Sequence, residues 1–142
     1  MIAVDTNLLV YAHRRDSDFS ERAYACIRQL AEGAGNWAIL WPCLHEFYAI
    51  VTHPRIYDPP STRHEALDQI DAWLESPGVI LLAEPENYKS HLRAALEGGQ
   101  IVGARVHDAR IAALCAAHGI RELWTADRDF GRFQSLRARN PM

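Results

Sequence analysis

The sequence predicts an α/β protein with a mostly parallel central sheet flanked by helices. Short apolar runs alternate along the chain with longer segments whose apolar residues recur at helical spacing. The runs are apolar on both faces, as in strands buried within a parallel sheet. No internal repeat, low-complexity tract or linker interrupts the 142 residues, so we expect one domain spanning residues 1–142.

Four short apolar runs are expected to form strands. They lie at residues 2–4, 37–41, 79–82 and 122–125. The segments between them are expected to form helices, because they carry apolar residues at a period near 3.6. The tail at 137–142 carries no pattern that assigns it to a helix or a strand.

Helix ends are indicated by caps and breakers. The pairs Asp18/Glu21 and Thr62/Glu65 have the spacing of capping boxes, so a helix should begin at each. Pro42 suits the first turn of a helix. Gly119 is expected to end the helix that covers about 105–118, in which Ile111, Leu114 and Cys115 face inward. The same signals give a helical segment from about Leu8, a helix that Asn87 could cap, and a short helix containing Phe130 and Phe133.

Composition limits the class of protein. Hydrophobic residues make up 49% and charged residues 23%, which are ordinary values for a soluble protein. The N-terminus carries no pattern of a signal peptide and no apolar run is long enough to span a membrane, so we expect a cytoplasmic protein. The three cysteines, Cys26, Cys43 and Cys115, are expected to be buried free thiols.

Four acids far apart in the sequence are expected to meet. Asp5 follows the first strand, and Asp127 follows the fourth. Glu46 and Asp108 lie near the amino ends of their helices. In a parallel α/β sheet, the carboxyl ends of strands and the amino ends of the following helices share one edge, where ligands usually bind.

A cluster of four carboxylates indicates a divalent metal site. Like charges at close range raise each other's pKa, and a cation relieves that conflict. Carboxylates and water are hard oxygen ligands, so Mg²⁺ or Mn²⁺ fits better than zinc. Such a site can activate water and orient a phosphodiester for hydrolysis.

Three segments resemble PIN-domain proteins, especially the VapC toxins. Residues 4–12 (VDTNLLVYA) resemble the opening motif of that family, and residues 125–130 (TADRDF) its closing motif. Glu46 and Asp108, the latter in VHDARI (106–111), match its middle acidic positions. The resemblance covers nearly the whole chain and implies a three-layer sandwich with a mostly parallel sheet of four to five strands.

The resemblance also implies a function and partners. The expected activity is endoribonucleolytic cleavage of structured RNA such as tRNA or rRNA, dependent on Mg²⁺ or Mn²⁺. The expected role is that of the toxin in a type II toxin–antitoxin pair. The toxin is expected to be a homodimer and to be inhibited by a VapB-type antitoxin. The metal-binding and catalytic residues would be Asp5, Glu46, Asp108 and Asp127.

Further residues are expected around this site. Asn7 and Thr125 should orient ligands or waters, and Asp129 could contribute through water or be a surface acid. Arginines near the site are expected to contact RNA phosphates: Arg14, Arg15, Arg105, Arg110 and Arg128. Trp41 is expected in the core, whereas Trp37 and Trp73 fit either the core or a partner groove.

Two other functions fit parts of the pattern. An aspartate-based phosphatase or a receiver domain would use Asp5 as the phosphorylated residue, but the phosphatase pattern requires an acid where Asn7 stands. Both classes require a lysine near the phosphate, and the single lysine, Lys89, lies in a mid-chain helix. A catalytically inactive PIN module that binds RNA or a protein partner is the second alternative, although all four acids are present.

Overall fold

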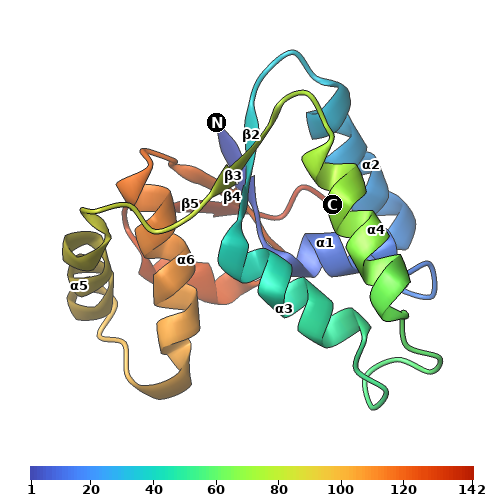
Figure 1. The fold of residues 1–142 in the computed structure, drawn as a ribbon. Coiled ribbons are helices and arrows are strands. Elements are labelled where there is room, and N and C mark those ends of the chain that lie inside the picture. Colours follow the sequence, from blue (N-terminus) through green and yellow to red (C-terminus); the bar gives the residue numbers. More distant parts are fainter.

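The computed structural model describes residues 1–142 as a five-stranded parallel sheet surrounded by six α-helices (Figure 1). The strand order is β3-β2-β1-β4-β5, and every neighbouring pair is parallel. The strands are β1 (Ile2–Val4), β2 (Trp37–Leu40), β3 (Val79–Leu82), β4 (Glu122–Trp124) and β5 (Arg137–Arg139). The helices are α1 (Thr6–His13), α2 (Ser20–Glu32), α3 (Trp41–Val51), α4 (Arg63–Leu74), α5 (Tyr88–Gly98) and α6 (Val106–Ala117), with short 3₁₀ helices η1 (Gly103–Arg105) and η2 (Arg128–Arg132).

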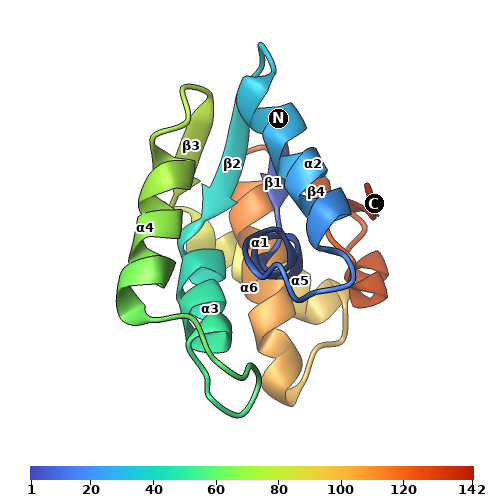
Figure 2. The same cartoon turned by 90° about the vertical axis from the view of Figure 1, so that its right-hand side faces the viewer.

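The helices form two layers, one on each side of the sheet. Helices α5 and α6 lie on one side, and α1, α2 and α4 lie on the other (Figure 1). Figure 2 shows α1 and α2 in front of the strands, while α3 continues from the carboxyl end of β2. The predicted fold class, a three-layer sandwich with a parallel sheet, is therefore confirmed.

Local signals explain where several helices begin and end. The side chain of Asp5 accepts a hydrogen bond from the Thr6 amide and caps α1, so β1 ends there. Thr62 and Glu65 form the predicted capping box of α4. Gly119 has a φ of +71°, a conformation that glycine adopts without strain, just past the end of α6.

The capping box of α4 gives a prediction for stability. The Thr62→Ala variant should lose about 1 kcal/mol of unfolding free energy, because the Glu65 amide loses the hydroxyl that accepts its hydrogen bond. Urea unfolding of the variant and the unaltered protein measures the difference. The matched control is Glu65→Gln, which retains a side-chain acceptor for the Thr62 amide. Equal stability of Thr62→Ala and the unaltered protein would contradict the prediction.

The structure corrects three details of the expected elements and assigns the tail. Asp18 and Glu21 do not form a capping box, because α2 begins at Ser20 with Phe19 as its N-cap and without a side-chain cap. Asn87 is the N-cap of α5, but its side chain makes no capping hydrogen bond. Trp41 is not a core residue: it opens α3 and is 40% exposed. The unassigned tail supplies β5, which pairs with β4 at the edge of the sheet.

The core lies between the sheet and both helix layers. Trp37 and Trp73 are buried, and the Trp73 ring packs edge-on against Phe47 at a centroid distance of 4.9 Å. All three cysteines are free and buried, as predicted. No helix combines the length and the apolar character needed to cross a bilayer.

Candidate active site

The four predicted acids line one pocket at the carboxyl edge of the sheet. Asp5 follows β1, Glu46 lies on α3, Asp108 lies in the first turn of α6, and Asp127 precedes η2. The pocket has a volume of about 260 Å³, and all four acids belong to its lining. The parallel topology therefore brings together residues that are up to 122 positions apart in the sequence.

Asp5 is the most deeply placed of these acids, with only 6% of its surface exposed. Its Oδ1 accepts a hydrogen bond from the Thr6 amide at 2.8 Å. Its Oδ2 accepts from the Thr125 hydroxyl at 2.7 Å and from Asn7 Nδ2 at 3.2 Å. The thiol of the buried Cys43 approaches Oδ1 at 3.9 Å. Both carboxylate oxygens are thus fixed in orientation.

Thr125 is the centre of a small hydrogen-bond network that joins the two ends of the chain. While its hydroxyl donates to Asp5, it accepts from Asn7 Nδ2 and from the Asp127 amide, both at 3.0 Å. Asn7 Oδ1 in turn accepts from the Ala126 amide at 3.0 Å. Asn7 and Thr125 therefore hold the segment that carries Asp127 against the end of β1.

Glu46 contributes to the pocket from its exposed side. Its Oε2 accepts a hydrogen bond from the Thr6 hydroxyl at 3.0 Å. Thr6 is buried, and its amide also binds Asp5, so one residue orients two of the four acids. The signal for Thr6 in the sequence is its place directly after Asp5, at the start of a helix.

Asp108 and Asp127 form a tight acidic group with Asp129. One carboxylate oxygen from each of the three lies within 4.8 Å of the others. Asp129 carries an ion pair with Arg105 at 2.9 Å, and its amide donates to Asp127 Oδ1 at 2.8 Å. These three carboxylates are close enough to share a cation.

Two acids of the pocket, Asp5 and Asp108, have raised pKa values. Burial raises the pKa of Asp5 to about 6, and the charges of Glu46 and Asp108 add to the rise. Burial also raises the pKa of Asp108, with a further contribution from Asp127. A positive ion in the pocket would favour the ionised form of both groups.

The five predicted RNA-contacting arginines differ in their surroundings. Arg105 pairs with Asp129, and Arg110 pairs with Glu84 at 2.8 Å. Arg15 and Arg128 are exposed and form no ion pair. The remaining arginine, Arg14, has an ion pair with Asp16 and several other contacts within the chain.

The pocket also contains residues that the sequence did not reveal. His107, the neighbour of Asp108 in the sequence, belongs to the lining. Tyr11, Ile50 and Tyr57 add an apolar portion to the same pocket. Tyr11 stands within the opening motif, but no sequence signal connects Tyr57 with the acids.

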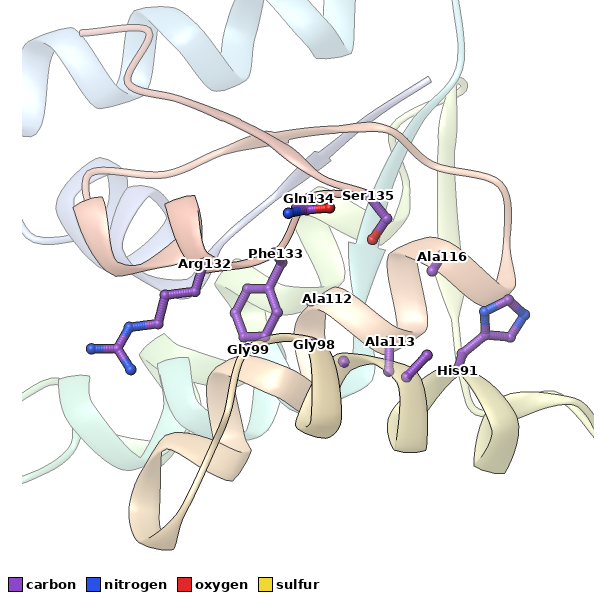
Figure 3. A pocket seen from close by; sticks show the side chains of 12 residues that line it. His91, Gly98, Gly99, Ala112, Ala113, Ala116, Arg132, Phe133, Gln134 and Ser135 are labelled. Carbon is purple, nitrogen blue, oxygen red and sulfur yellow. The ribbon is translucent and has the colours of Figure 1, made fainter.

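A second pocket has a different character. It encloses about 300 Å³ between α5, α6 and residues 132–135 (Figure 3). Alanine and glycine form much of its lining, together with Phe133, and none of its lining residues carries a carboxylate. The chemistry that the sequence predicts therefore belongs to the acidic pocket.

Comparison with known proteins identifies the family. The sequence model of the PIN domain matches residues 2–136, so the chain belongs to the PIN domain family. Ribonuclease VapC48 of Mycobacterium tuberculosis is 31% identical over 137 residues, covering 96% of this chain and 94% of the relative. Ribonuclease VapC43 of the same organism is 32% identical over 146 residues, covering 100% of this chain and 96% of the relative. These relatives confirm the resemblance to the VapC-type toxins.

A solved structure supports the fold. VapBC2 from Rickettsia felis, crystallised with a DNA fragment from its promoter, aligns with a TM-score of 0.68. The alignment covers 98% of both chains at 23% sequence identity. The parallel sheet with its two helix layers is thus the architecture of a VapC-type PIN domain.

Proposed function

We propose that this chain is a metal-dependent endoribonuclease that hydrolyses phosphodiester bonds in structured RNA, such as tRNA or rRNA. One observation carries the proposal: four acids from four separate elements line a single pocket at the carboxyl edge of the sheet. The curated relatives VapC48 and VapC43 are named ribonucleases, which supports the same reaction class.

The donor set of the pocket fits Mg²⁺ or Mn²⁺. Its acidic side chains offer carboxylate oxygens, and two of them, Asp108 and Asp127, lie with the neighbouring Asp129 within 4.8 Å of one another. Asp5, Glu46, Asp108 and Asp127 would hold the metal, with Asp129 beside them. When bound, a divalent ion supplies Lewis acidity and orients water and phosphate for hydrolysis.

Neighbouring residues fix the orientation of the Asp5 carboxylate through hydrogen bonds. Thr125 and Asn7 fix Asp5 Oδ2, and the Thr6 amide fixes Oδ1, so the orientation of the buried carboxylate is set by the chain itself. Glu46 is exposed, which leaves this side of the pocket open to a polymer substrate.

The geometry disfavours the phosphatase alternative. Both oxygens of Asp5 accept hydrogen bonds within the chain, which suits a fixed ligand better than a nucleophile. Asn7, where a phosphatase would carry an acid, donates to Asp5. The single lysine, Lys89, lies on α5 and does not line the pocket.

Cleavage assays with total tRNA and rRNA test the proposal. The purified chain should cut RNA in the presence of Mg²⁺ or Mn²⁺ and lose this activity with EDTA. RNA that is bound but not cut under either condition would favour an inactive binding module. Release of phosphate from a small phosphomonoester, without RNA cleavage, would favour the phosphatase.

The Thr125 hydroxyl should matter for this activity. Thr125→Val preserves the shape of the side chain but removes the group that binds Asp5, Asn7 and the Asp127 amide. We expect a fall in cleavage rate of about 10- to 100-fold, as for residues that orient metal ligands. Thr125→Ser retains a hydroxyl and should recover most of the rate in the same assay. Full activity of Thr125→Val would contradict the assigned role.

We further propose that the chain acts as the toxin of a VapBC-type pair and as a homodimer. Its similarity to VapC-type proteins supports this role. Exposed large apolar side chains, among them Trp41, Leu67 and Val102, offer surface for protein contacts. A short upstream reading frame whose product binds the chain and inhibits cleavage would support the pair, and light scattering of the purified chain measures the oligomer. A chain that is monomeric at all concentrations would contradict the homodimer.

A further inference from the structure

The acidic pocket has two chemically different portions. The carboxylates form one portion, and the side chains of Tyr11, Ile50 and Tyr57 contribute to the other. A metal ion and a phosphate need only the first. The aromatic portion is chemically suited to contact a flat, apolar group.

Tyr57 is held at the pocket by Arg14. It lies in the loop between α3 and α4, and the guanidinium carbon of Arg14 lies 4.2 Å from the centre of its ring. This distance is typical of a cation–π contact, which stabilises the orientation of the ring. Tyr57 is only partly buried, so part of its surface stays available.

All three guanidinium nitrogens of Arg14 donate hydrogen bonds within the chain. Nε and Nη2 donate to the two carboxylate oxygens of Asp16 at 2.9 and 2.6 Å. Nη2 also donates to the Pro59 carbonyl at 3.0 Å, and Nη1 donates to the Ser61 hydroxyl at 3.3 Å. The side chain is 12% exposed. Arg14 therefore fixes the loop that carries Tyr57 and is poorly placed to bind a phosphate.

The orientation of the Tyr11 ring is also set by a neighbouring side chain. It lies on α1, and its ring packs against Phe19 at a centroid distance of 5.3 Å. Two tyrosines whose orientations are set by neighbours thus line the pocket that holds the four acids.

We propose that Tyr57 and Tyr11 form a subsite for a nucleobase next to the scissile phosphate, with Arg14 as a positioning residue for Tyr57. Unpaired bases of RNA stack on aromatic side chains, and this stacking tolerates different bases. The subsite would explain recognition of single-stranded loops within a structured RNA. The inference rests on the proposed RNA cleavage.

Cleavage kinetics with an oligoribonucleotide test whether Tyr57 contributes to substrate binding. Tyr57→Ala should raise KM about tenfold and leave kcat nearly unchanged, since stacking of one base contributes about 1–3 kcal/mol. Tyr57→Phe retains the ring and should keep KM close to that of the unaltered chain. Tyr24→Ala is the matched control, because Tyr24 is 58% exposed and does not line the pocket.

A second measurement reports directly on the base. An oligoribonucleotide with one abasic position beside the cleaved bond should bind the unaltered chain about tenfold more weakly than the complete strand. Tyr57→Ala should bind both strands equally, because the partner of the base is gone. A merely structural role of Tyr57 would leave the preference for the complete strand intact.

The salt dependence of RNA binding shows whether Arg14 positions Tyr57 or contacts a phosphate. Arg14→Lys should raise KM about threefold to tenfold, because lysine lacks the planar fork that holds Asp16 and covers Tyr57. Arg14→Gln should leave the slope of log affinity against log salt unchanged. A slope reduced by about 0.7–0.9 would identify a phosphate contact and overturn the positioning role.

The outcomes distinguish this inference from the proposed function. Metal-dependent cleavage by the unaltered chain, together with unchanged KM and unchanged base preference in Tyr57→Ala, would overturn the nucleobase subsite alone. Failure of the unaltered chain to bind or cleave any RNA would overturn the proposed function and the subsite together.

Discussion

Replacing Asp5 with asparagine should lower RNA cleavage by at least about a hundredfold while the fold persists. Asparagine has the same shape but cannot place a negative charge on the two oxygens that lie deepest in the pocket. Its Oδ1 can still accept from Thr125 and Asn7, whereas the Thr6 amide loses its acceptor. Relief of a buried charge offsets that loss, so the variant should remain folded.

The test of Asp5→Asn needs a measurement of folding and a control variant at an acid outside the pocket. Circular dichroism and thermal unfolding should be nearly unchanged in Asp5→Asn. Asp18→Asn removes an exposed carboxylate that does not line the acidic pocket, and it should cleave RNA at the normal rate. Undiminished cleavage by Asp5→Asn would remove Asp5 from the catalytic machinery.

The metal-free protein should become less stable as pH rises through the range between the two pKa values of Asp5. In the unfolded chain its pKa has the ordinary value of 3.8, and burial raises the folded value to about 6. Below the lower value both states hold the proton, and Asp5 makes no contribution. Above the higher value the folded state bears a buried charge, which lowers the free energy of unfolding by about 3 kcal/mol.

Urea unfolding in EDTA at about pH 4 and about pH 7 measures this effect. Between these two pH values the unaltered chain should lose about 2 kcal/mol more unfolding free energy than Asp5→Asn. Mg²⁺ or Mn²⁺ should restore stability near pH 7, since a bound cation stabilises the folded state. Identical pH profiles of the two proteins would show that Asp5 is not electrostatically strained.

The fold class was predictable because short apolar runs and turn residues report on neighbouring positions in the chain. The strands at 2–4 and 79–82 and the capping box at Thr62 follow directly from such local patterns. The edge strand β5 did not, because its residues are Arg137, Ala138 and Arg139. A strand with one open edge needs little apolar character, and it forms here because β4 offers a hydrogen-bonding partner.

Trp41 was predicted to lie in a strand and in the core, and both predictions are wrong. Its apolar character and its place after a buried run suggested a continued strand. The following Pro42 suits a helix start, and α3 begins at Trp41. The side chain is therefore carried out of the sheet and packs beside His45 on the surface, with ring centroids 5.9 Å apart.

Convergence of the acids was predictable from topology, whereas the other pocket residues were not. Asp5 and Asp127 follow parallel strands, so one edge of the sheet collects them. Tyr57 reaches the same pocket from a loop, whose path depends on contacts such as those of Arg14 with Pro59 and Ser61. Contacts of this kind leave no periodic trace in the sequence.

The hydroxyl of Thr125 ties the start of the chain to its last fifth, and this has a consequence during synthesis. A nascent polypeptide that has not yet reached residue 125 carries Asp5 without the threonine that fixes it, and it lacks Asp127 and Asp129 altogether. Prematurely terminated products therefore cannot assemble the pocket. Under the proposed function, a nascent chain gains the ability to cleave RNA only after translation has passed Asp127.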